Sequence, residues 1–109
     1  MTTFHGNIHS KWSKMSIYEQ MANVGAEVGR AITWRNKNNE EISRNAFYRA
    51  LELIDTTVFV TTKKSSIKEL LRLREILVDY FAGENIYNST DEWLNKYFYY
   101  YNFAANKDR

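Results

Sequence analysis

The chain has 109 residues with no cysteine and no proline, and 16% of its residues are aromatic. This length is typical of one domain, and the absence of cysteine excludes disulfides and thiolate chemistry. Fifteen basic and 13 acidic side chains give a net charge of +2, too balanced to indicate nucleic-acid binding by itself. We find neither a secretory signal pattern nor a run of roughly 18 apolar residues, so we expect a cytoplasmic protein with no membrane association.

Residues 1–15 precede the first helix signal and are interpreted as an N-terminal arm. Its two histidines, His5 and His9, are spaced four apart, but a zinc or iron site would need further ligands nearby. We therefore expect no metal and no cofactor, and an arm held to the surface by its apolar side chains. These are Phe4, Ile8 and Trp12.

Serine followed three residues later by glutamate opens three apolar periodic segments, at 16–19, 66–69 and 89–92. This is the capping-box pattern, in which the serine hydroxyl and the glutamate carboxylate each accept from a free amide of the first turn. A fourth helix start is expected at Asn39, because the two glutamates that follow it favour the positive end of the helix dipole.

Apolar residues at helical spacing then predict helices over 17–36, 40–58, 67–82 and 90–105. Four amphipathic helices joined by short loops predict an all-α fold, an up-down-up-down four-helix bundle over residues 16–109.

Three glycines carry structural expectations. Gly25 and Gly29 lie one turn apart within the first helix, where glycine costs about 1 kcal/mol relative to alanine. We expect another helix to approach closely there, although tolerated surface glycines are the alternative. Gly83 follows the third helix, where a left-handed residue commonly ends a helix.

Charged residues lie on or beside the apolar stripes of the first three helices. A charge in such a position is costly unless it is paired. We expect an interhelical ion-pair network. The alternatives are a polar pocket or phosphate site with Arg49 and Arg74 as donors, and side chains that simply snorkel to solvent. The residues concerned are Glu27, Arg30, Arg49, Glu52, Asp55 and Arg74.

Catalytic signatures are weak throughout. A di-metal carboxylate bundle needs Glu-x-x-His motifs, and the chain contains none. Both histidines precede every arginine, so the Arg-to-His motif of bundle ribonucleases of the HEPN type cannot form. Neither a phosphate-binding glycine loop nor a nucleophile elbow is present. We therefore expect a protein that is not an enzyme.

The last helix carries six aromatic rings within 97–103. Because successive residues turn by about 100°, these rings surround the helix. Two stripes are expected to face inward: Trp93, Tyr97, Tyr100 and Ala104, and Leu94, Phe98, Tyr101 and Ala105. Tyr99 and Phe103 would then face solvent, and exposed neighbouring aromatics usually mark a contact surface. We predict self-association centred on Tyr99 and Phe103, with help from Trp93.

Nucleic-acid binding is the second hypothesis. Residues 1–38 carry five basic and two acidic side chains, and exposed tyrosines could stack on bases. Around the aromatic cluster, however, basic residues are few, which favours a protein partner, either a second copy or a protein encoded nearby. The five basic residues in 1–38 that would contact nucleic acid are Lys11, Lys14, Arg30, Arg35 and Lys37.

The segments "SIYEQMANVGAEVGRAITWR", "SRNAFYRALELID", "IKELLRLREILVDYF" and "STDEWLNKYFYYYNFAA" resemble a family of short, uncharacterised bacterial and archaeal helical proteins. That resemblance implies a helical fold and transfers no catalytic residue. More remotely, the layout is similar to four-helix-bundle proteins of the ribosomal-RNA (rRNA) intervening-sequence class and to the accessory variability determinant of diversity-generating retroelements. These resemblances imply ring-shaped oligomers, commonly pentamers, and for the retroelement protein a role with a reverse transcriptase and nucleic acid.

Overall fold

The computed structural model describes residues 11–107. Over this range the chain forms four helices and no strand, which confirms the all-α prediction. Phe4, His5, Ile8 and His9, which the sequence analysis singled out, lie outside the described residues. The helices are α2 (Ile17–Asn36), α3 (Glu40–Val60), α4 (Lys64–Ala82) and α5 (Asp91–Lys107).

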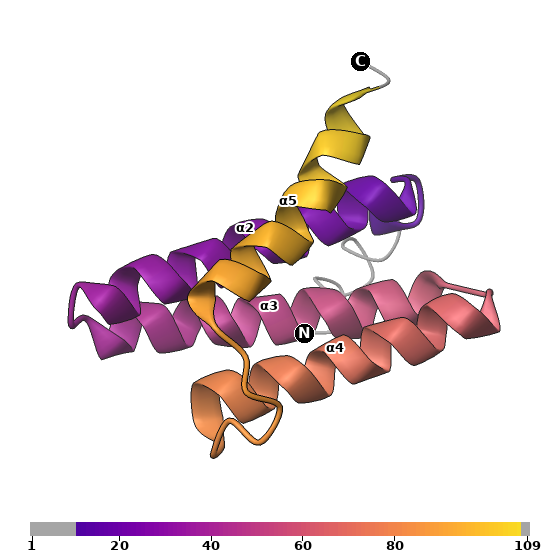
Figure 1. Cartoon of the computed structure of the whole chain (residues 1–109). Coiled ribbons are helices and arrows are strands. Elements are labelled where there is room, and N and C mark those ends of the chain that lie inside the picture. The colour runs from indigo at the N-terminus through magenta and orange to yellow at the C-terminus, as the bar shows by residue number, and fades with distance from the viewer. Residues whose placement is uncertain (1–10, 108–109) are drawn as a thin grey trace, which may run out of the picture.

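The helices form the predicted up-down-up-down bundle (Figure 1). Helices α2, α3 and α4 lie side by side in chain order, each antiparallel to the next. Helix α5 returns across α2 at a steep angle, and its last turns rise beyond the other helices (Figure 1). The fourth helix is therefore covered less completely than the other three.

Local capping chemistry explains two of the helix starts as predicted. At α2, the Glu19 amide donates to Ser16 Oγ at 3.1 Å and the Ser16 amide donates to Glu19 Oε1 at 3.3 Å, which completes the capping box. At α3, the Ile42 amide donates to the Asn39 side chain at 3.1 Å.

The other two capping predictions are wrong. Helix α4 begins at Lys64, two residues before Ser66, and neither proline nor glycine lies there to interrupt the helix. Helix α5 is capped by Thr90, whose hydroxyl accepts from the Trp93 amide at 3.0 Å. Ser89 is instead buried, and its amide donates to the Asn85 side chain.

Gly83 also differs from the prediction. Its φ of −111° is not left-handed. Left-handed φ values occur instead at Asn38, after α2, and at Asn85 and Asn88, in the loop before α5. Asparagine tolerates this conformation better than most residues, because its short side chain hydrogen-bonds to local backbone.

The core lies between α2 and α3 and is completed by residues from α4 and α5. Its members are apolar side chains at helical spacing, as the stripes predicted. They are Met21, Val24, Val28, Ala31, Ile32, Ala46, Phe47, Ala50, Ile54, Leu70, Leu73, Leu77, Leu94 and Phe98.

Trp12 joins the N-terminal segment to this bundle. Its buried indole Nε1 donates to Thr57 Oγ1 of α3 at 2.7 Å, and Gln20 Nε2 of α2 donates to its carbonyl at 2.8 Å. This contact confirms the prediction that Trp12 is an anchor. None of the helices between residues 11 and 107 combines the length and hydropathy that crossing a membrane requires.

Candidate functional site

The inner face of α5 packs on α2 at a glycine. Leu94 and Phe98 are buried, and a Cβ placed on Gly25 would meet the Phe98 ring and Cβ at 2.7–2.9 Å. Only glycine therefore allows this crossing, which confirms the close approach predicted at Gly25. At Gly29 the prediction is wrong, since no other described helix comes within 4 Å of such a Cβ.

Beside this face, two half-buried tyrosines connect α5 to α4. The hydroxyls of Tyr97 and Tyr101 donate to the same oxygen of Glu69, at 2.8 and 2.9 Å. Burial, together with the hydrogen bonds to Tyr101 and Glu69, raises the pKa of Tyr97 far above its ordinary value. Both phenols thus remain protonated donors through the physiological range.

The outer face of α5 exposes four aromatic side chains. Trp93 is 45% exposed, Tyr99 68%, Tyr100 61% and Phe103 60%. Exposure of Tyr99 and Phe103 agrees with the sequence prediction, but the inward placement of Trp93 and Tyr100 is wrong. Helix α5 leans across α2 (Figure 1), and the other described helices leave Tyr100 largely uncovered.

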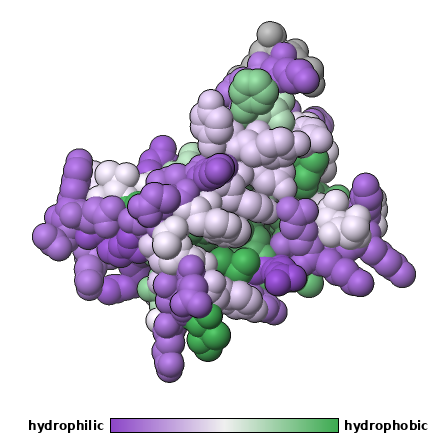
Figure 2. Space-filling view, viewed as in Figure 1, coloured by the Kyte–Doolittle hydropathy of each residue, from purple (hydrophilic) through white to green (hydrophobic). Residues whose placement is uncertain are grey.

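A hollow remains between α4 and α5. It has a volume of about 180 Å³, and Figure 2 shows hydrophobic atoms at its floor. Trp93 lies at its edge, stacked on Tyr97 with ring centroids 5.5 Å apart and planes 17° from parallel. The lining residues are Glu69, Arg72, Leu73, Ile76, Trp93 and Tyr97.

The first turn of α5 is anchored by a polar cluster. The carboxylate of Asp91 accepts from Arg35 Nη2 at 2.5 Å, from the Tyr80 hydroxyl, and from Asn36 Nδ2 at 3.2 Å. Burial alone would raise the pKa of Asp91, but the hydrogen bonds from Tyr80, Arg35 and Asn36 outweigh it and lower the pKa. The guanidinium of Arg35 also lies over the rings of Tyr80 and Phe81.

The basic residues of the nucleic-acid hypothesis do not form one surface. Arg35 is engaged with Asp91, and Lys37 lies over the Trp34 ring at 5.0 Å. Lys11 and Lys14 are exposed at the opposite end of α2, and a helix of this length separates its ends by about 30 Å. Arg30, at mid-helix, pairs with Glu27 at 3.0 Å.

The charges beside the core form ion pairs in two places. Glu27 of α2 binds Arg30 and, across the helix interface at 3.3 Å, Arg49 of α3. Asp55 of α3 binds Arg74 of α4 through two contacts of 2.8 and 3.3 Å. Within residues 11–107, Glu52 forms no ion pair. Since Arg49 and Arg74 bind different carboxylates, the geometry supports the ion-pair interpretation over a shared phosphate site.

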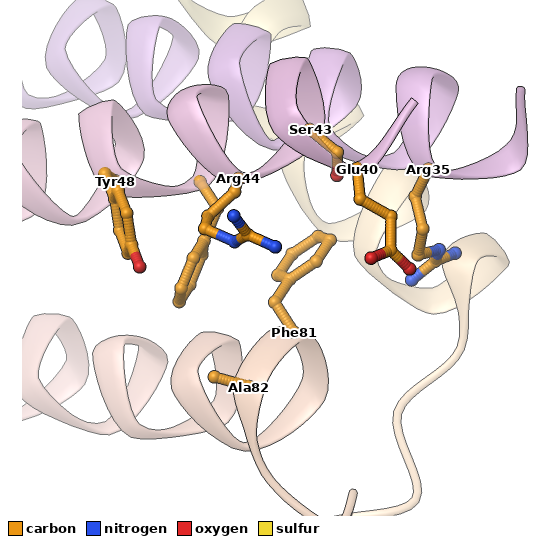
Figure 3. Close-up of a pocket in the computed structure, with 8 residues that line it drawn as sticks. Arg35, Glu40, Ser43, Arg44, Tyr48, Phe81 and Ala82 are labelled. Carbon is orange, nitrogen blue, oxygen red and sulfur yellow. The ribbon is translucent and has the colours of Figure 1, made fainter. Parts of the chain in front are cut away.

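A shallow cavity of about 180 Å³ lies between α3 and α4 (Figure 3). Its apolar wall contains Phe47 and Phe81, whose ring centroids are 5.2 Å apart. Arg44 and Glu40 both extend over this wall in Figure 3, and neither has an ion-pair partner among the described residues. Arg44 and Glu40 carry opposite charges, and the guanidinium of Arg35, which also lines the cavity, is paired with Asp91.

The outer face of α5 is therefore the candidate functional site. Sequence reasoning found Trp93, Tyr99 and Phe103, and it missed Tyr100. Between residues 11 and 107, no group of three or more His, Cys, Asp or Glu side chains is placed to hold a metal ion.

Comparison of the chain with protein-family models, with curated proteins and with solved structures gives no match. The resemblances drawn from the sequence therefore stay predictions.

Proposed function

We propose that this protein is a non-enzymatic interaction or accessory protein that self-associates through the outer face of α5. One observation carries the proposal: Tyr99, Tyr100 and Phe103 are each at least 60% exposed and lie within five consecutive positions. Clustered exposed aromatics are typical of protein interfaces, and a second copy always presents the same face.

The balance of charge supports a protein partner over nucleic acid. The helical residues around the exposed rings include Lys96 and Lys107, but also Asp91 and Glu92. A surface that stacks bases usually combines its aromatics with a continuous basic groove. Burial of aromatic rings at a protein interface needs no such groove.

Sedimentation velocity between 1 and about 100 μM tests the proposal over the range where weak to moderate dimers form. We expect the wild-type protein to sediment increasingly as an oligomer as its concentration rises. The double variant Tyr99→Ser/Phe103→Ser should remain monomeric, because it removes the two central rings.

A matched control is the double variant Tyr48→Ser/Ile86→Ser. It also removes one tyrosine and one apolar residue, at positions that are 56% and 77% exposed but lie outside α5. This control should associate like the wild type. A wild-type protein that stays monomeric at 100 μM, or equal losses in the two double variants, would overturn the proposal.

The nucleic-acid hypothesis makes the opposite prediction about salt. Self-association driven by aromatic burial should persist or strengthen when salt is raised, whereas contacts to phosphate weaken steeply. Titration of single-stranded RNA and DNA at low salt completes the comparison: binding that depends on Lys11, Lys14 and Lys37 would favour nucleic acid.

A further inference from the structure

The exposed side of α5 carries an ordered seam. Five of its residues recur at intervals of three or four positions and therefore share one face of the helix. They are Glu92, Lys96, Tyr99, Phe103 and Lys107. All five are exposed, and the seam lies on the side of the helix opposite Leu94 and Phe98. Spacing of this kind is typical of a helix that pairs with another helix.

Charge is distributed unevenly along the seam. Its first residue is acidic, its last is basic, and the aromatic residues lie between them. A parallel pair of such helices would place Glu92 against Glu92 and Lys107 against Lys107. An antiparallel pair would place each glutamate against a lysine, which is favourable at both ends.

We propose that two copies pair through antiparallel α5 helices in a two-fold symmetric dimer. This inference rests on the proposed self-association and adds its partner, stoichiometry, orientation and register. In the register that sets Glu92 opposite Lys107 of the second copy, Tyr99 lies opposite Tyr100 of the second copy. Lys96 lies opposite Phe103 of the second copy, where its ammonium and ring can attract each other.

The exposed surface of α5 has a depression that can receive side chains of a partner helix. A depression of about 240 Å³ lies on the seam, lined by Tyr99, Asn102, Phe103, Asn106 and Lys107. Side chains of a facing helix insert into holes of this kind. The last turns of α5 also rise clear of α2, α3 and α4, so the other helices do not block the approach (Figure 1).

Disulfide trapping tests the orientation, because the chain has no cysteine of its own. The variants Glu92→Cys and Lys107→Cys, carrying tags of different size, are mixed and oxidised. We expect a mixed disulfide dimer between the two variants and almost no disulfide between two Glu92→Cys chains. In the proposed register two copies of position 92 lie about 22 Å apart, far beyond the roughly 7 Å limit for a disulfide.

The outcomes separate this inference from the proposed function. Disulfides mainly between identical variants would show a parallel pair, which overturns the orientation but keeps self-association through α5. An oligomer larger than a dimer would overturn the stoichiometry. Wild-type protein that sediments as a monomer would overturn both proposals. As a control, the mixed disulfide should disappear when both cysteine variants also carry Tyr99→Ser/Phe103→Ser.

Charge reversal supplies a second test without a covalent bond. The single variants Glu92→Lys and Lys107→Glu should each raise the dimer dissociation constant, by up to about tenfold at low salt, because each creates two like-charge contacts. A mixture of the two variants should associate like the wild type. An unchanged dissociation constant for both single variants at low salt would contradict the antiparallel register.

Discussion

Helices α3 and α5 are both amphipathic, with 21 and 17 residues, but their surroundings differ. Helix α3 packs against α2 on one side and α4 on the other, whereas α5 packs closely against α2 and reaches α4 through the hydrogen bonds of Tyr97 and Tyr101 to Glu69. The exposed large apolar residues of α3, which are Ile42, Tyr48 and Phe59, are scattered along the helix. In α5, Tyr99, Tyr100 and Phe103 lie within five positions of its second half, and Trp93 lies in its first turn. Scattered exposed residues are ordinary, and clustered ones indicate a missing neighbour.

The two faces of α5 provide the largest test of this contrast. Leu94→Ala should lower the free energy of unfolding by about 2–5 kcal/mol, because Leu94 is fully buried and leaves a cavity. Phe103→Ser should change the free energy of unfolding of the monomer by less than about 0.5 kcal/mol. Urea denaturation measures the free energy of unfolding of both variants, at a protein concentration low enough to keep the chains monomeric. Equal effects would mean that α5 has no distinct outer face.

The two glycines of α2 test where α5 crosses that helix. Gly25→Ala should destabilise the protein by about 1–3 kcal/mol, since the added methyl overlaps Phe98. Gly29→Ala should instead stabilise it by up to about 1 kcal/mol, because the site is open and alanine favours the helix. Thermal unfolding of the two variants beside the wild type gives the sign of each effect. A stabilising Gly25→Ala would contradict the close approach.

The anchor at the first turn of α5 should depend on pH. The folded protein holds the pKa of Asp91 below its ordinary value of about 3.9, so the carboxylate stabilises the fold above that value. This contribution should disappear as the pH falls from about 4 through the lowered pKa. Asp91→Asn should cost about 1–2 kcal/mol at pH 7 and should flatten the acid limb of the stability profile. An identical acid limb in wild type and variant would show that Asp91 does not anchor α5.

The smallest effect is expected where α2 meets α3. Arg49→Gln removes the ion pair with Glu27, but Arg49 is half exposed and Glu27 keeps Arg30 as a partner. The expected loss in the free energy of unfolding is below about 0.5 kcal/mol and should vanish in high salt. A loss above about 1 kcal/mol in chemical denaturation would mean that this ion pair contributes more to the α2–α3 contact than an exposed pair does.

Some features followed from sequence because they are local. The caps at Ser16 and Asn39 need only side chains within three residues of the backbone they satisfy. The misplaced start of α4 shows the limit of this reasoning, since Ser66-to-Glu69 matches the same pattern but lies inside the helix. A capping pattern marks a helix start only where the preceding residues do not extend the helix themselves.

The sequence by itself determined the four helices, the apolar stripe of each, and the excess of aromatic side chains on the last one. These properties depend on spacing and composition along one helix. Only the tertiary structure decided that α5 leans across α2, that Phe98 rests on Gly25 and not on Gly29, and that Tyr100 faces solvent. Helix periodicity shows which residues share a face, but the crossing angle set by side-chain packing decides which faces are covered.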